Sequence, residues 1–152
     1  MRHALAAITL AFSALSSPAS NSDERTPAYD HFATAEQRLC RHVFNGEMFA
    51  RTELFFGLSR PDGSEITEAE FDGFLDDFVT PRFPDGLTLL SGDGQFKDST
   101  DAIIEEGSKL LILLYPLSRE SSALVDDIRS DYKDQFQQQS VLRADEQSCV
   151  SF

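Results

Sequence analysis

The chain of 152 residues has no tryptophan, only two cysteines, and 13 lysine and arginine residues against 26 acids. A net charge of −13 disfavours nucleic acid and anionic lipid as partners, because both bind through lysine and arginine at phosphates. No run of 18 apolar residues is present, so no membrane span is expected. Hydrophobic residues, at 41%, are enough for a packed core. The composition predicts one soluble, acidic domain.

Histidine is also scarce: the chain has only His3, His31 and His42, and all three precede residue 51. A Ser-His or Cys-His nucleophile, or a histidine-rich zinc site, is therefore excluded from the rest of the chain. No second pair of metal ligands accompanies Cys40 and His42, so we expect no metal site there. Gly92-Asp93-Gly94 lacks the spacing of a phosphate-binding loop, which favours a turn or bulge and no cofactor. Whether the protein is an enzyme stays open.

An acidic run between residues 93 and 106 could gather a calcium ion, but it lacks the twelve-residue loop pattern with its central glycine and terminal glutamate. A solvated acidic loop is the favoured interpretation. The run consists of Asp93, Asp98, Asp101, Glu105 and Glu106.

The first 19 residues have the layout of a secretory signal peptide. Arg2 gives a positive start, residues 4–15 are mostly apolar, and Ser17-Pro18-Ala19 places small residues before a cleavage point. The apolar run is too short to span a bilayer. An N-terminal anchor helix or a disordered tail is the alternative. We therefore expect a secreted or periplasmic protein that begins near Ser20.

Cys40 and Cys149 lie near opposite ends of this mature chain. In an oxidising compartment, an even pair is most simply a disulfide. Two separate thiols, one of them reactive, are the alternative.

Helix signals occur at three places. Thr34 with Gln37 predicts a capping box before a short helix that ends near His42, within a polar segment over residues 20–50. Thr67 with Glu70 predicts a second box, and the helix after it ends near Pro81. A third helix is expected after Ser118. The two longer helices carry apolar stripes at helical spacing: Phe71, Phe74, Leu75, Phe78 and Val79, then Leu124, Val125, Ile128, Tyr132 and Phe136.

Strand patterns surround these helices. Residues 51–58 alternate, residues 87–97 form a second strand with a bulge at 92–94, and residues 140–144 close the chain. Residues 109–115 are almost wholly apolar and predict a strand buried on both faces. The order β-α-β-β-α-β over residues 51–152 predicts an α+β, ferredoxin-like sandwich: a four-stranded antiparallel sheet with two helices on one face.

Several stretches resemble a family of exported bacterial proteins known only as a domain of unknown function. They are residues 52–63 (TELFFGLSRPDG), 79–88 (VTPRFPDGLT), 108–109, 132–133 and 138–143, and the likeness covers about residues 51–152. The chain departs from the family pattern at three positions, with Phe55 for an expected Tyr, Phe96 for Trp and Gln139 for Glu. The resemblance implies an exported domain and supplies no catalytic residue.

The sheet face away from the helices is the predicted site. Alternation that buries Leu54 and Phe56 turns Glu53 and Phe55 the other way. We expect Lys109 and Arg143 to join Glu53 there, either as cross-strand ion pairs, which is favoured, or as a recess that binds a carboxylate or polarises a carbonyl. The candidate ligand-binding residues are Glu53, Phe55, Lys109, Tyr115 and Arg143.

The same face is expected to be too apolar to stay wet, because Leu111, Leu113, Tyr115 and Val141 are placed beside Phe55. A second copy of the chain, the N-terminal segment or a ligand would cover it. The leading hypothesis is an exported binding module that self-associates, as a homodimer, or binds a partner through this face. The rival is a small-molecule binder or enzyme of dimeric α+β barrel type that uses Glu53, Lys109 and Arg143.

Overall fold

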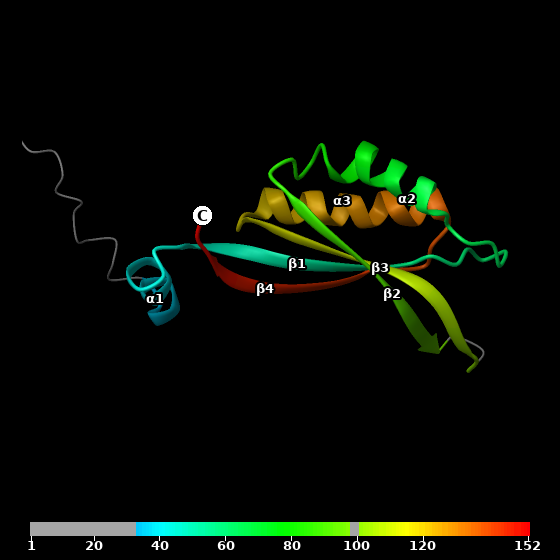
Figure 1. Ribbon diagram of the computed structural model, residues 1–152, viewed down its shortest axis with the longest axis horizontal. Coiled ribbons are helices and arrows are strands. Elements are labelled where there is room, and N and C mark those ends of the chain that lie inside the picture. The colour runs from blue at the N-terminus through cyan, green and yellow to red at the C-terminus, as the bar shows by residue number, and fades with distance from the viewer. Residues whose placement is uncertain (1–32, 98–100) are drawn as a thin grey trace, which may run out of the picture. The chain divides into compact units, whose positions relative to one another are not determined.

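The computed structural model describes residues 33–97 and 101–152, which form four strands and three α-helices (Figure 1). The elements in chain order are α1 (Ala35–His42), β1 (Glu47–Gly57), α2 (Glu68–Phe74) continued by the π-helical segment η2 (Leu75–Val79), β2 (Leu87–Lys97), β3 (Ile103–Pro116), α3 (Arg119–Phe136) and β4 (Leu142–Val150). The predicted signal peptide and residues 20–32 lie outside the described residues. No helix in these two ranges is long and apolar enough to cross a membrane.

The four strands form one antiparallel sheet in the order β2-β3-β1-β4. Strands β1 and β3 are central neighbours, and β4 lies beside β1. The α+β class is confirmed. β1 begins at Glu47, four residues before the predicted start, and its Ala50 is already part of the buried core.

Helices α2 and α3 lie on the same side of the sheet (Figure 1). Their apolar stripes bury an aromatic cluster against β1. The centroid of the Phe56 ring lies 5.5 Å from that of Phe71 and 4.5 Å from that of Tyr132. Aromatic rings at such separations add packing energy beyond the area that they bury. The predicted stripes therefore do form the core, although Leu75, Phe78 and Leu124 are only partly buried at its margin.

Both predicted capping boxes are present. The Thr67 backbone N–H donates to Glu70 Oε2 at 2.9 Å, and the Glu70 N–H donates back to Thr67 Oγ1 at 3.3 Å. The same exchange joins Thr34 and Gln37 at the start of α1. These bonds satisfy backbone donors that the first helical turn leaves without partners, so each box sets where its helix begins.

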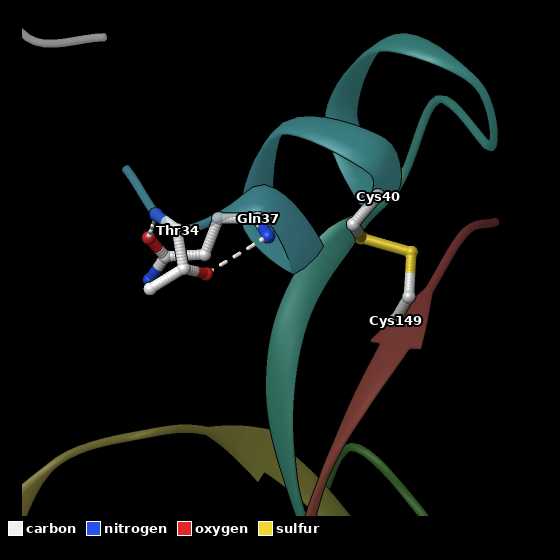
Figure 2. Close-up of a disulfide and its surroundings, with 4 residues drawn as sticks. All are labelled: Thr34, Gln37, Cys40 and Cys149. Carbon is white, nitrogen blue, oxygen red and sulfur yellow. Dashed lines mark hydrogen bonds between the residues drawn. A yellow bond between two sulfur atoms is a disulfide. The ribbon is translucent and has the colours of Figure 1, made fainter. Parts of the chain in front are cut away.

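A disulfide joins Cys40 on α1 to Cys149 on β4, as predicted, across a sequence separation of 109 residues (Figure 2). No free cysteine remains. Gly46, between α1 and β1, allows this close packing, because a Cβ there would lie 2.8 Å from Cys149 Sγ and 2.7 Å from the Val150 carbonyl oxygen. Helix α1 is thus tied to the last strand of the sheet.

Two strand predictions were wrong. The pairing of β2 with β3 runs without interruption from Leu87–Leu113 to Lys97–Ile103, so no bulge occurs at residues 92–94. β3 is buried on one face only, since Leu111 and Leu113 are fully buried whereas Leu114 is 43% exposed. A continuous apolar run predicts burial on both sides, but here half of that run lies on the face that α2 and α3 do not cover.

Candidate functional site

The register of β1 with its neighbours assigns each candidate to a face, because directly opposite residues in an antiparallel sheet point to the same side. Leu54 pairs with Leu111 and with Arg143, and Phe56 pairs with Lys109. These residues share the side of Phe56, which packs on α2 and α3, and we call it the helix face. The opposite side, which carries Glu53 and Phe55, is the open face.

The predicted cluster of Glu53, Lys109 and Arg143 does not form, because Glu53 lies on the open face and the two cations lie on the helix face. Alternation correctly divides the residues of one strand between its two faces. It does not determine which face of the next strand lies on the same side of the sheet, because a shift of one residue in register exchanges the faces. Leu111, Leu113 and Tyr115 also belong to the helix face by this register, and Val141, just before β4, is buried in the same core.

Lys109 is a buried cation that links three elements. Its side chain is 3% exposed, and its Nζ donates to Glu68 Oε1 and Oε2 and to Ser91 Oγ, each at 2.7 Å. The ammonium also lies 5.9 Å from the centre of the Phe71 ring. A cation with this set of partners joins β3 to α2 and β2, and it is structural.

Glu53 pairs within its own face. Its carboxylate lies 2.6 Å from Arg51 NH2, and Arg51 NH1 lies 2.7 Å from Glu146 on β4. Hydrogen bonding to Glu146 raises the pKa of Arg51, burial opposes the rise, and the charge of Glu53 adds to it. The three side chains are 23% to 57% exposed, so this is a partly solvated ion-pair cluster across two strands.

The open face is strongly apolar elsewhere. Register pairs make one continuous row across all four strands, which we call the apolar row: Leu142 of β4, Phe55 of β1, Leu110 of β3 and Leu90 of β2. Leu142 is 61% exposed and Leu90 is 50% exposed. The open face is therefore apolar, but of the five residues predicted to make it so only Phe55 lies there.

A hollow of about 520 Å³ continues the apolar surface toward the C-terminal end of β3. Ile112 and Leu114 form its floor on the open face, beside Phe49 and Thr88 of the neighbouring strands. Aromatic and aliphatic side chains supply most of its wall, so it suits apolar groups.

A polar chain lies on the helix face near the start of α3. The hydroxyls of Thr52 and Tyr115 are 2.6 Å apart, and Thr52 Oγ1 donates to Asp145 Oδ1 at 2.5 Å. Thr52 is fully buried and Tyr115 is 5% exposed. Because the only hydroxyl proton of Thr52 goes to the carboxylate, the Tyr115 hydroxyl is the donor to Thr52.

Arg143 binds Asp145, the last residue of this polar chain. Its Nε donates to both oxygens of Asp145, its NH1 donates to Asp126 and to the Ser122 carbonyl, and its NH2 donates to Ser122 Oγ. Burial lowers the pKa of Arg143, but the hydrogen bonds to Asp145 and Asp126 outweigh that effect and raise it overall. Hydrogen bonds from Arg129, opposed by burial and aided by Arg143, lower the pKa of Asp126.

These residues border a cavity of about 330 Å³ between α3, β1 and β4, which we call the α3 cavity. It is lined by Ala50, Tyr115, Leu117, Ser122, Arg143, Asp145, Glu146 and Gln147. Two predicted candidates, Tyr115 and Arg143, are thus brought together, without Glu53, Phe55 or Lys109.

Sequence analysis missed Thr52 and Asp145. The spacing of Arg143 and Asp145 was the available signal, because residues two apart on a strand share a face. The partnership of Thr52 with Asp145 depends on the pairing of β1 with β4, which no local pattern reveals. Among residues 33–97 and 101–152, no group of three or more His, Cys, Asp or Glu side chains is placed to hold a metal ion.

A family model described as "Protein of unknown function (DUF3574)" matches residues 51–152. No curated protein matches the chain. Among solved structures, a phage SAM lyase in complex with S-methyl-5'-thioadenosine is similar, with 16% sequence identity, a TM-score of 0.53, and coverage of 68% of this chain and 90% of that chain. The same lyase in its apo state gives 16% identity, a TM-score of 0.51, and coverage of 69% and 92%. At this identity the likeness is one of fold alone.

Proposed function

The chain belongs to the DUF3574 family, whose function is unknown, and we propose that this member is an exported domain that self-associates through the open face of its sheet. The observation that carries the proposal is the apolar row, which crosses all four strands and leaves Leu90 and Leu142 at least half exposed. Contiguous apolar surface of this kind is characteristic of interaction sites. The geometry favours a second copy of the chain as the occupant.

The apolar row is suited to a two-fold contact between identical sheets. A two-fold axis parallel to the strands places Leu142 of one copy opposite Leu90 of its partner, and Phe55 opposite Leu110. Every position then meets another apolar side chain, as an isologous interface requires. Two sheets packed face to face in this way would give a dimeric α+β barrel.

The charge of the chain agrees with this choice. A chain of net charge −13 repels its own copies, and the apolar row is a part of its surface where two copies can approach without bringing acids together. All four strands are paired side by side at four positions, Thr52 to Phe55 of β1, so the proposed contact is centred on the apolar row.

We also propose that the fold is a ferredoxin-like sandwich. The sheet order β2-β3-β1-β4, with α2 and α3 on one face, supports a ferredoxin-like sandwich. In that arrangement the helices cover one side of the sheet, so the other side needs a partner when it is apolar.

We also propose that residues 1–19 are a signal peptide and that the protein works outside the cytoplasm. The Cys40–Cys149 disulfide supports this location, because such bonds persist in oxidising compartments. Mass spectrometry of protein recovered from the periplasm or medium should find a chain that begins at or near Ser20. Exported protein that retains Met1 would contradict the proposal.

Sedimentation equilibrium on the mature protein tests self-association. Leu90→Lys places a charge at one end of the apolar row, on an exposed position of an edge strand, and should raise the dimer dissociation constant at least tenfold. Ile103→Lys makes a comparable change on the other side of β3, where the side chain is 61% exposed, and should leave the dimer intact. Equal dissociation constants for the two variants would contradict the assignment of the interface to the open face.

A further inference from the structure

We propose that the α3 cavity binds a small organic ammonium compound. The cavity lies on the helix face, so the proposal is independent of self-association through the open face. Its volume of about 330 Å³ falls within the range of small-molecule sites. Ala50, Leu117 and the Tyr115 ring give it apolar walls beside a few convergent polar groups.

The direction of the hydroxyl chain shows what the Tyr115 oxygen can offer. Thr52 donates its proton to Asp145, and Tyr115 donates its proton to Thr52. The Tyr115 oxygen can therefore present only lone pairs to the cavity. Asp145 adds a carboxylate whose side chain stays 48% exposed while Thr52 and Arg143 hold it in place. Two acceptors side by side favour a ligand that donates hydrogen bonds.

The charges near the cavity favour a cation among such donors. Arg143 is matched by Asp145 and by Asp126, which also pairs with Arg129, and the net charge of −13 on the chain attracts a cation to the half-exposed carboxylate of Asp145. An ammonium group is the compact cation that donates three hydrogen bonds, so it fits acceptors better than a neutral hydroxyl does.

The first turn of α3 favours an anion rather than a cation in the cavity, because a helix N-terminus attracts anions. Here Ser118 caps that turn through the Ser121 N–H, and Glu120 already supplies a negative charge. Four of the N–H bonds of Arg143 are also committed to protein oxygens. An anion would therefore find the nearest donors occupied, and it would lie beside Asp145.

Three probes of one length and different charge test the inference: 1,4-diaminobutane, 1,4-butanediol and succinate. Each is titrated into the ¹⁵N-labelled mature protein, and backbone amide shifts are followed. The diamine should bind most tightly and shift the amides of Leu117, Ser122 and Gln147, which line the cavity. Tyr115→Phe removes one acceptor and should weaken diamine binding about tenfold or more.

Two further variants control for charge and folding. Asp145→Asn should weaken binding at least as much as Tyr115→Phe, whereas Glu65→Gln, in the loop before α2, removes the same charge and should change it less than twofold. Thermal melts identify any variant that has lost its fold. If Asp145→Asn does not fold, the diamine affinity of Tyr115→Phe decides the test. Succinate binding as tightly as the diamine, shifts that ignore Tyr115→Phe, or the absence of any shift would each overturn the inference.

Discussion

Phe55 of β1 and Leu110 of β3 are direct cross-strand partners at the centre of the sheet, on the face opposite α2 and α3. Leu142 flanks Phe55 and Leu90 flanks Leu110, so the apolar row reaches both edges of the sheet. A sheet with one solvated face normally alternates apolar and polar residues between its two sides. Here both sides carry apolar side chains, which is the physical basis for proposing a partner.

The disulfide should contribute strongly to stability. Replacing both Cys40 and Cys149 by serine should lower the free energy of unfolding by about 2–5 kcal/mol, because the bond closes a long loop and restricts the unfolded chain. Urea denaturation of the mature protein, with and without the double substitution, measures the difference. A loss below about 1 kcal/mol would show that the unfolded chain gains little freedom when the bond is removed.

The capping box at Thr67 should be measurable by itself. Thr67→Ala should cost about 1 kcal/mol in denaturant melts, because it removes the side-chain acceptor for the Glu70 N–H. An unchanged midpoint would mean that water replaces the cap. The corresponding change at Thr34→Ala is a matched control, since that box begins α1, which lies outside the aromatic core.

Glu70 makes the same box sensitive to pH. Hydrogen bonds from the Thr67 backbone N–H and hydroxyl, and then from Arg60, lower the pKa of Glu70 below its ordinary value of 4.5. Its ionised form therefore stabilises the folded chain above pH 4.5, and this contribution is lost as the pH falls through the lower folded-state value. Thr67→Ala should raise the Glu70 pKa in an NMR titration, and an unchanged value would contradict this account of the shift.

Lys109 and Glu68 should respond differently to substitution. Lys109→Met should be neutral or stabilising, because a hydrophobic residue of similar volume avoids the cost of burying the ammonium group. Glu68→Ala should cost about 1–3 kcal/mol, since it removes the carboxylate that compensates this buried charge. Both are read from denaturant melts, and a larger loss for Lys109→Met than for Glu68→Ala would contradict the assigned roles.

Glu53 should matter little for the stability of one chain. Glu53→Gln removes one partner of a partly solvated pair with Arg51, so the expected change in unfolding free energy is about 0–1 kcal/mol. The measurement is a denaturant melt under conditions in which the protein is monomeric. A loss above about 2 kcal/mol would show that Glu53 has a buried partner that the register does not give it.

Features set by neighbours in the sequence could be predicted, and features set by register could not. The Thr67–Glu70 box and the helical stripe that begins at Phe71 follow from local spacing, and both are present. The faces of Lys109 and Arg143 depend on how three strands pair, and one residue of register exchanges the two faces.

The polar chain of Thr52, Tyr115 and Asp145 was missed for the same reason. Its members come from three strands, with a sequence separation of 63 from Thr52 to Tyr115 and of 93 from Thr52 to Asp145. The Cys40–Cys149 bond spans a still longer sequence separation. It could be predicted because the chain has only two cysteines, so each has only one possible partner.

The most direct test of self-association is an isotope-filtered NOE spectrum of a mixed sample, in which ¹³C-labelled and unlabelled mature chains have been combined. The interface proposed here predicts contacts between the Phe55 ring of one copy and leucine methyl groups of the other, with Leu110 as the nearest partner. Leu90 and Leu142 should show contacts between copies in the same spectrum. Intermolecular contacts confined to other surfaces, or none at concentrations where the protein is dimeric, would contradict the assignment of the open face.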